Sequence, residues 1–351
     1  MGPSASSDLF QLFQREFRLC RLEPGEVVAV VSESGSRAEY VEASLGAAQA
    51  LGARVFHLGL PKTHRQDVPF IDEARAGGNR QSALSTAVKA LKEANLVIDL
   101  TVEGLIHAPE RGEILGAGAR MLTIIEPPDV LHRCFPREDL RRRVERAAQL
   151  LGESTTLRVT SDAGTDLTMT VAQAPLVTQY GYTDQRGRWD HWPSGLVAVY
   201  PQEGSTQGTV VLDVGDIVFP FKRYIESPVE FVVRQGYIRE INGQGLDADL
   251  LRDYFASWRD PEAYATSHMG WGLDETARWN SLALYDKGEI IGVEPRSFYG
   301  NFMFSTGPNR YANRFTRCHL DMPMRRCTVY LDDRPIIERG EIVHPEMIVT
   351  R

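Results

Sequence analysis

The chain has 351 residues, and its 47 acidic against 39 basic side chains give a net charge of −8 at pH 7. This acidic balance argues against non-specific binding to nucleic acid or to anionic membranes. No apolar run reaches the ~18 to 20 residues that a membrane span requires, and the first residues do not form a secretory signal. The four cysteines are scattered without a C-x-x-C pair, which predicts reduced thiols in a cytoplasmic protein.

In the first 150 or so residues, apolar strands alternate with amphipathic helices, which predicts a parallel, doubly wound sheet. We expect strands at 26–31, 54–58, 96–100 and 121–125, and helices at 37–51, 82–94 and 137–151. Pro127 and Pro128 are expected to stop the chain before the last of these helices. Sheets of this kind bind ligands at the carboxyl ends of their strands, where His107 follows one predicted strand. No phosphate-binding glycine motif is present, so we expect neither a dinucleotide nor a P-loop site.

From about residue 155 the pattern changes to short alternating strands. A hairpin is predicted at 229–241 with its turn at Gly236, then a helix at 247–257 and a last hairpin in the sequence TVYLDDRPII. The sequence therefore predicts an α/β protein with two domains. Residues 1–154 would form a Rossmann-like, doubly wound domain that contributes to a substrate cleft. Residues 155–351 would form an α+β catalytic domain, with mostly antiparallel strands, that carries a metal site.

The segment RCHLDMP supplies the best candidate for metal binding. In an extended chain, residues two apart project to the same side, so His319 and Asp321 can converge on one point. A second histidine would complete the two-His-one-carboxylate face that holds non-haem Fe(II). His268, in SHMGWG, is the best candidate, and its two glycines suit a tight turn. The alternatives are an edge strand with polar residues facing water, and a buried histidine bonded to the backbone.

A second cluster surrounds His191, which lies between Trp189 and Trp192. Two indole rings beside a titratable imidazole suit the binding of a flat aromatic substrate, but a packing cluster at a domain junction is an equally good interpretation. Gln179 is expected to line the same cleft. Arg296 is predicted either to hold a substrate oxygen or to form a surface ion pair.

Six segments in order, YGYTDQRGRWDHWPSG, VVLDVGDI, SHMGWGL, FYGNFMFSTGPN, RCHLDMP and YLDD, resemble the 2,5-dihydroxypyridine 5,6-dioxygenases of nicotinic acid degradation. The resemblance extends over nearly the whole chain. It implies an Fe(II) cofactor bound by four residues: His268, Ser305, His319 and Asp321. It also implies a substrate pocket that includes Ile106, His107, His191 and Arg296. Where the family has a glutamate, this chain has Gln179, and an anionic acceptor is lost.

The resemblance further implies ring cleavage of 2,5-dihydroxypyridine by O2 to N-formylmaleamic acid. His107 or His191 would act as the base, since an imidazole titrates near neutrality, and the sequence leaves the choice open. Trp189 and Trp192 would exclude water from the reacting face. A dinuclear hydrolase of the metallo-aminopeptidase type, and a ligand-binding protein without catalysis, are the alternatives. We also expect a homo-oligomer.

Overall fold

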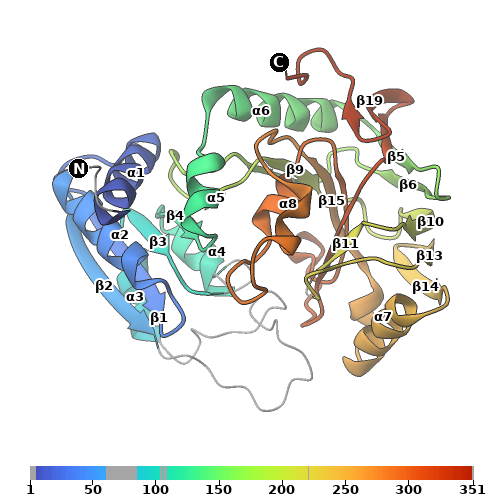
Figure 1. Ribbon diagram of the computed structural model, residues 1–351, viewed down its shortest axis with the longest axis horizontal. Helices are drawn as coiled ribbons and strands as arrows, with labels where there is room; N and C mark the ends of the chain where they lie inside the picture. Colours follow the sequence, from blue (N-terminus) through green and yellow to red (C-terminus); the bar gives the residue numbers. More distant parts are fainter. Residues whose placement is uncertain (1–4, 61–84, 103–104, 106–108, 220, 350–351) are drawn as a thin grey trace. The chain divides into compact units, whose positions relative to one another are not determined.

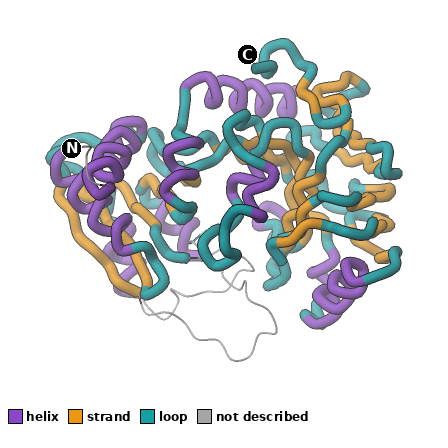
Figure 2. The backbone as a smooth tube through the Cα atoms, viewed as in Figure 1, coloured by secondary structure: helices purple, strands orange, loops and turns teal. Residues whose placement is uncertain are grey.

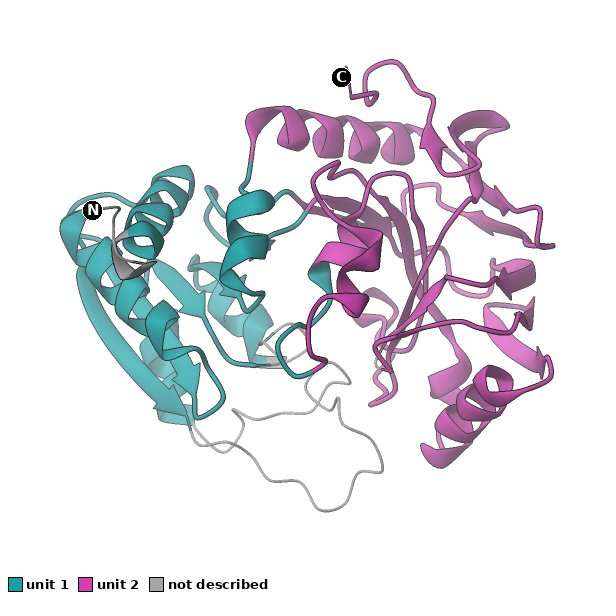
Figure 3. Cartoon of the chain, in the orientation of Figure 1, with its two compact units in different colours: residues 1–136, 180–194, 288–293 teal, residues 137–179, 195–287, 294–351 magenta. Residues whose placement is uncertain are grey.

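The computed structural model describes residues 5–60, 85–102, 105, 109–219 and 221–349. The chain forms two compact units, each of which is built from three separate segments (Figure 3). The first unit comprises Met1–Pro136, Tyr180–Ser194 and Gly288–Val293, and the rest of the chain forms the second. These units differ from the continuous domains predicted at 1–154 and 155–351, because two later segments return to the first unit.

The first unit contains a five-stranded sheet in which every neighbouring pair is parallel. Its strands, in spatial order, are β2 (Arg54–Leu60), β1 (Val27–Glu33), β3 (Leu96–Asp99), β4 (Arg120–Ile124) and β8 (Trp189–Trp192). Strands β1 to β4 are labelled in Figure 1. The predicted parallel sheet is therefore confirmed. Strands β3 and β4 are buried along their whole length, as expected for a sheet that is covered on both faces.

Five α-helices of the first unit are described. They are α1 (Ala5–Leu19), α2 (Ala38–Ala50), α3 (Ser85–Lys92), α4 (Pro109–Gly116) and α5 (Pro128–Arg133). Ala29 and Val31 of β1 pack in one core cluster with Val88 of α3 and Ile114 of α4. Because side chains alternate along a strand, the equally buried neighbours of these β1 residues face the other side. Helix α5 was not predicted: Pro128 begins it, and proline is well tolerated in a first turn. The stop predicted before the next helix is present, since that helix begins only at Glu138.

Strand β8 was not predicted as a strand. Its sequence, WDHW, lacks the β-branched run typical of a buried parallel strand. It nevertheless pairs with β4 in parallel register, with His191 opposite Thr123. The tryptophan and histidine cluster is therefore part of the first sheet.

The second unit contains more strand than helix, and loops connect its many short strands (Figure 2). An eight-stranded antiparallel sheet has the order β14 (Tyr237–Asn242), β13 (Val229–Arg234), β10 (Gln207–Leu212), β6 (Asp166–Thr170), β5 (Thr156–Thr160), β18 (Thr328–Leu331), β19 (Arg334–Glu338) and β20 (Glu341–Ile342). A five-stranded antiparallel sheet has the order β17 (Leu320–Met324), β16 (Phe302–Thr306), β15 (Thr266–Gly272), β9 (Leu196–Val199) and β7 (Leu176–Gln179). The prediction of mostly antiparallel strands is confirmed.

The smaller elements of this unit are a two-stranded ribbon, β11 (Ile217–Val218) with β12 (Arg223–Tyr224), and three α-helices. The helices are α6 (Glu138–Glu153), α7 (Leu246–Ser257) and α8 (Val293–Ser297), whose first residue belongs to the first unit. Three short 3-10 helices span Pro261–Tyr264, Trp279–Ala283 and Arg310–Ala312.

Both predicted hairpins are present, and each has a turn with two left-handed residues. In β13–β14 these are Gln235 (φ 51°) and Gly236 (φ 74°), and in β18–β19 they are Asp332 (φ 45°) and Asp333 (φ 64°). Two positive φ angles in succession give the turn twist that matches paired strands, and glycine and aspartate tolerate them best.

Among the residues described here, no helix is long and apolar enough to cross a membrane.

Candidate metal centre

Three predicted ligands lie together on the five-stranded sheet. His268 is on β15, Asp321 is on β17, and His319 immediately precedes β17. Strand β16 lies between β15 and β17, and its Ser305 is paired with Asp321. One ligand atom from each of His268, His319 and Asp321 falls within 4.8 Å of the other two. Neighbouring antiparallel strands thus gather side chains that are 53 positions apart in the chain.

His319 and Asp321 project to the same side of the chain, as the alternation of side chains along an extended chain predicts. Leu320 is fully buried, and the two polar side chains on either side of it converge on the opposite face. Pro323 follows Asp321 by two residues. It lies inside β17, opposite Met303, and β17 is an edge strand of its sheet. An edge strand tolerates proline because one side of its backbone need not donate to a neighbouring strand.

The tight turn predicted for SHMGWG is wrong, because these residues form an interior strand of the sheet. The two glycines are required because neighbouring backbone segments approach this strand closely. A Cβ atom on Gly270 would lie 1.9 Å from the carbonyl oxygen of Val197, and one on Gly272 would lie 2.3 Å from that of Phe298. Only glycine permits these contacts, which fix the strand that carries His268.

Each imidazole has a fixed orientation. His319 Nδ1 lies 2.8 Å from the carbonyl oxygen of Thr306, to which it must donate, so its Nε2 is left unprotonated when the ring is neutral. His268 Nδ1 lies 3.1 Å from Ser305 Oγ. The two Nε2 atoms lie 3.3 Å (His268) and 3.2 Å (His319) from Asp321 Oδ1. Outer hydrogen bonds of this kind are how proteins hold metal-binding histidines.

The charge states also suit a metal site. Burial opposes ionisation of Asp321, but interactions with His319 and Arg296 outweigh it and hold the pKa of the carboxyl well below its usual range. Burial lowers the pKa of His268 against the opposing effect of Asp321, which favours the neutral imidazole. Among the described residues, no donor makes a well-aligned hydrogen bond to the buried Oδ1 of Asp321. A buried carboxylate oxygen beside two imidazole nitrogens is a donor set that a divalent cation would satisfy.

Arg296 is not a surface ion pair. It is 8% exposed, and its Nε donates to Asp321 Oδ2 at 2.6 Å. Its guanidinium carbon lies 3.8 Å from the centre of the Phe219 ring, a cation–π contact. The substrate contact expected of Arg296 stays a prediction.

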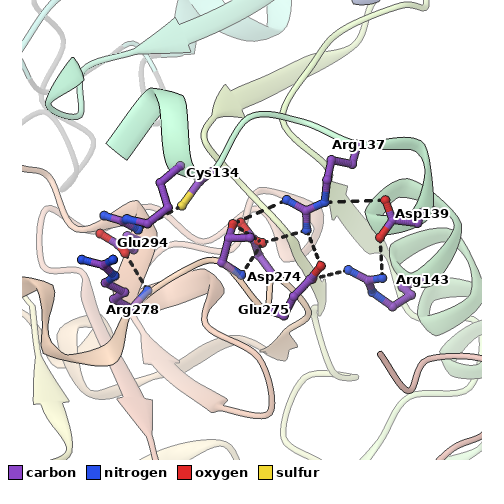
Figure 4. Close-up of polar contacts among 10 residues, drawn as sticks. Cys134, Arg137, Asp139, Arg143, Asp274, Glu275, Arg278 and Glu294 are labelled. Carbon is purple, nitrogen blue, oxygen red and sulfur yellow. Dashed lines mark hydrogen bonds and ion pairs between the residues drawn. The ribbon is translucent and has the colours of Figure 1, made fainter. Parts of the chain in front are cut away.

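A network of charged residues secures the segment that follows β15. Asp274 Oδ1 accepts from Arg137 at 3.3 Å, and Glu275 accepts from both Arg137 (2.7 Å) and Arg143 (Figure 4). The two arginines lie at the start of α6 and in its second turn. The carboxyl end of the strand that carries His268 is therefore tied to α6.

The remaining predicted site residues are not part of the cluster of three ligands. Gln179 ends β7 of the second unit and is 7% exposed. In the first unit, His191 is 5% exposed and meets the Trp189 ring edge-on, with 5.0 Å between ring centres. Trp192 is fully buried and makes edge contacts with the rings of Phe13 and Phe135. The predictions for Ile106 and His107 lie outside the described residues.

Sequence reasoning did not identify the interactions that orient the ligands. The carbonyl oxygen of Thr306 and the ring of Phe219 carry no recognisable sequence signal. Their roles follow from strand pairing, since Thr306 is opposite Leu320 and Phe219 forms a bridge with Asp321. A pairing of FMFST with HLDMP as neighbouring antiparallel strands would place Ser305 and Thr306 beside the H-x-D pair.

Known proteins resemble this chain over nearly its whole length. A protein from Pseudomonas putida KT2440 named 2,5-dihydroxypyridine 5,6-dioxygenase is 42% identical over 347 residues, which cover 98% of each chain. The solved structure of the 2,5-dihydroxypyridine dioxygenase from that organism matches with a TM-score of 0.94, covering 98% of this chain and 99% of the other.

A more distant match is the structure of wild-type AmpT from Thermus thermophilus, with a TM-score of 0.64 and 13% identity over 97% of this chain and all of the other. This likeness concerns the fold alone. Residues 8–344 match the model of the family described as 2,5-dihydroxypyridine 5,6-dioxygenase. On this match and on the 42% identity, the chain belongs to the 2,5-dihydroxypyridine 5,6-dioxygenase family.

Proposed function

We propose that this protein is an Fe(II)-dependent dioxygenase that opens the ring of 2,5-dihydroxypyridine between C5 and C6. Family membership favours ring cleavage over the hydrolase alternative. The observation that supports the metal site is the convergence of two imidazoles and one carboxylate on a single buried point. Substrate and O2 together contain all the atoms of N-formylmaleamic acid, so no additional reductant is required.

His268, His319 and Asp321 would hold the iron. Two nitrogens and one carboxylate oxygen are the donor set of non-haem Fe(II) oxygenases, and they leave positions open for O2 and substrate. Fe(II), when bound, would bring O2 and the ring together and let electron density pass between them. Ser305 supports the site through its contact with His268 Nδ1, and the resemblance also makes it a candidate ligand.

The protein would contribute a base, a binding surface and exclusion of water. His191 or His107 would take the proton of the C5 hydroxyl, which makes the ring more electron-rich before it meets O2. Arg296 and Gln179 are proposed to contact the substrate. Ile106 is proposed to line the pocket, and Trp189 and Trp192 to keep water from the ring.

A dinuclear hydrolase is less well supported. Dinuclear sites need carboxylates that bridge two metals, and the cluster among the described residues has one carboxylate. Glu294, which lies in a suitable region of the sequence, accepts a hydrogen bond from the backbone nitrogen of Arg278 at 2.6 Å. This bond commits one of its oxygens to the backbone.

The test is anaerobic loading with Fe(II), followed by measurement of bound metal and of O2 uptake with 2,5-dihydroxypyridine. We expect one iron per chain, and equimolar consumption of O2 and substrate. His319→Ala and Asp321→Ala should lose the iron while keeping the circular dichroism of the fold, whereas His132→Ala, at the surface, should behave as the parent. Turnover by an iron-free variant, or two zinc ions per chain, would refute the proposal.

A further inference from the structure

The two oxygens of Asp321 have different surroundings. Oδ1 faces the Nε2 atoms of both histidines at 3.2 and 3.3 Å. Oδ2 accepts from Arg296 Nε at 2.6 Å, a charge-assisted bond that is among the strongest a carboxylate makes. One oxygen is therefore committed to the guanidinium, and the other is directed to the point where the imidazoles meet.

Arg296 is itself held in place from several sides. Its guanidinium packs on the Phe219 ring at 3.8 Å, and Phe219 donates its backbone N–H to the Asp321 carbonyl at 2.9 Å. The backbone carbonyl of Arg296 accepts from Asn301 Nδ2 at 2.9 Å. Because Arg296 is 8% exposed, its side chain has little room to rotate away. Arginine, phenylalanine and aspartate thus form one rigid clamp around the carboxylate.

We propose that Arg296 is a positioning residue that restricts Asp321 to binding the metal through Oδ1 alone. The proposal rests on the function proposed above. A carboxylate can bind a metal through one or both oxygens, and a second bound oxygen would occupy a position needed for O2 or substrate. The guanidinium prevents this by occupying Oδ2, and so preserves the open side of the site.

Loss of this role by mutation has different consequences from loss of a substrate contact. The edge of the guanidinium that carries Nε is directed to Asp321, and one of its faces lies over Phe219. A substrate anchor lost by mutation would raise the KM for the dihydroxypyridine and leave the metal unchanged. A positioning residue lost by mutation changes the metal site in the absence of substrate.

The experiment uses Co(II) in place of iron, because the visible absorption of Co(II) weakens as its coordination number rises. The full-length protein, Arg296→Ala and Arg296→Gln are titrated with Co(II) without substrate, and the absorbance is compared per bound metal. Arg120→Ala is the matched control, since the Arg120 side chain is similarly buried (6% exposed against 9%) and is also paired with a carboxylate, that of Glu26, in the first unit.

We expect Arg296→Ala to bind Co(II) roughly 10–100-fold more weakly, the range seen for lost outer-shell partners. Its absorbance per bound cobalt should also fall. Added guanidinium ion should fill the space left by the side chain and restore the parent spectrum, which a merely structural defect would not allow. Arg296→Gln keeps an N–H donor, so its Co(II) affinity and its absorbance per cobalt should lie between those of the parent and Arg296→Ala. This variant also provides the test if the alanine variant does not fold.

An unchanged spectrum and affinity in both Arg296 variants would overturn this proposal and leave the proposed function intact. If the parent protein binds no metal, or if Asp321→Ala binds it equally well, the proposed function fails and this inference fails with it. The two failures are therefore distinguishable in one set of titrations.

Discussion

Replacing Gly270 with alanine should disrupt the sheet that carries the metal ligands. The new Cβ would lie 1.9 Å from Val197 O and 2.7 Å from Ala198 Cα, whereas real Cβ atoms essentially never approach below 3.0 Å. Both neighbours are backbone atoms of β9, so relief requires β15 and β9 to separate by about 1 Å. Strain of roughly 1–3 kcal/mol, and two weakened ladder hydrogen bonds at about 1 kcal/mol each, give a loss of roughly 3–5 kcal/mol.

The same shift should reach the metal site. His268 lies two residues from Gly270 on the same strand, and metal–ligand distances tolerate only about 0.2 Å. We therefore expect the Gly270→Ala protein to lose both metal affinity and stability, measured by Co(II) titration and by urea unfolding followed with circular dichroism.

Gly112→Ala is the control for this substitution. Gly112 is on helix α4, and a Cβ atom there would meet nothing within 4 Å. Alanine is the better helix former, so this variant should be more stable by about 0.5–1 kcal/mol. If Gly270→Ala unfolds within 1 kcal/mol of the parent protein, the close approach of β15 and β9 is not the reason for this glycine.

Two further predictions concern side chains with buried hydrogen bonds. Ser305→Ala removes the contact with His268 Nδ1, so Co(II) titration should give about tenfold weaker binding, with about 1 kcal/mol lost in urea unfolding; unchanged affinity would exclude an orienting role. Burial raises the pKa of Asp99 to about 6, although hydrogen bonds to its carboxylate oppose the shift. The protonated Asp99 carboxyl contributes to the free energy of unfolding. This contribution is complete below the pKa of about 4 that the group has in the unfolded chain, and it is lost as pH rises through 6. Between pH 5 and 7 the parent should lose roughly 1 kcal/mol that Asp99→Asn does not lose. Asp253→Asn, at an exposed position, should show the same change of unfolding free energy with pH as the parent. An equal change in all three proteins would refute the raised pKa of Asp99.

The sequence predicted the elements whose local signals agree with their surroundings. The run at 26–31 became β1 because its β-branched residues suit a strand buried on both faces. The hairpin around Gly236 formed because its turn residues accept the left-handed conformation that the strand twist requires. His319 and Asp321 converge because strand alternation places them on one side.

The features that were missed depend on contacts between distant segments. No local pattern separates a glycine in a turn from one in a crowded strand, so SHMGWG favours a turn on sequence alone, and only the close approach of β9 requires the strand. The sequence WDHW has no strand signature and is extended because it completes the edge of a parallel sheet. The pairing of Arg296 with Asp321 joins a short helix to an edge strand, and only the tertiary structure brings them together.

The late position of β8 in the chain has a consequence for biosynthesis. When β4 leaves the ribosome, its outer edge has no partner, and the strand that will cover it follows after about 65 further residues. Throughout that interval the nascent sheet presents a row of unpaired amides to other chains, a known route to aggregation. Slow translation or premature termination between these two points would lengthen this exposure, so soluble yield should depend on chaperones that shield the growing chain.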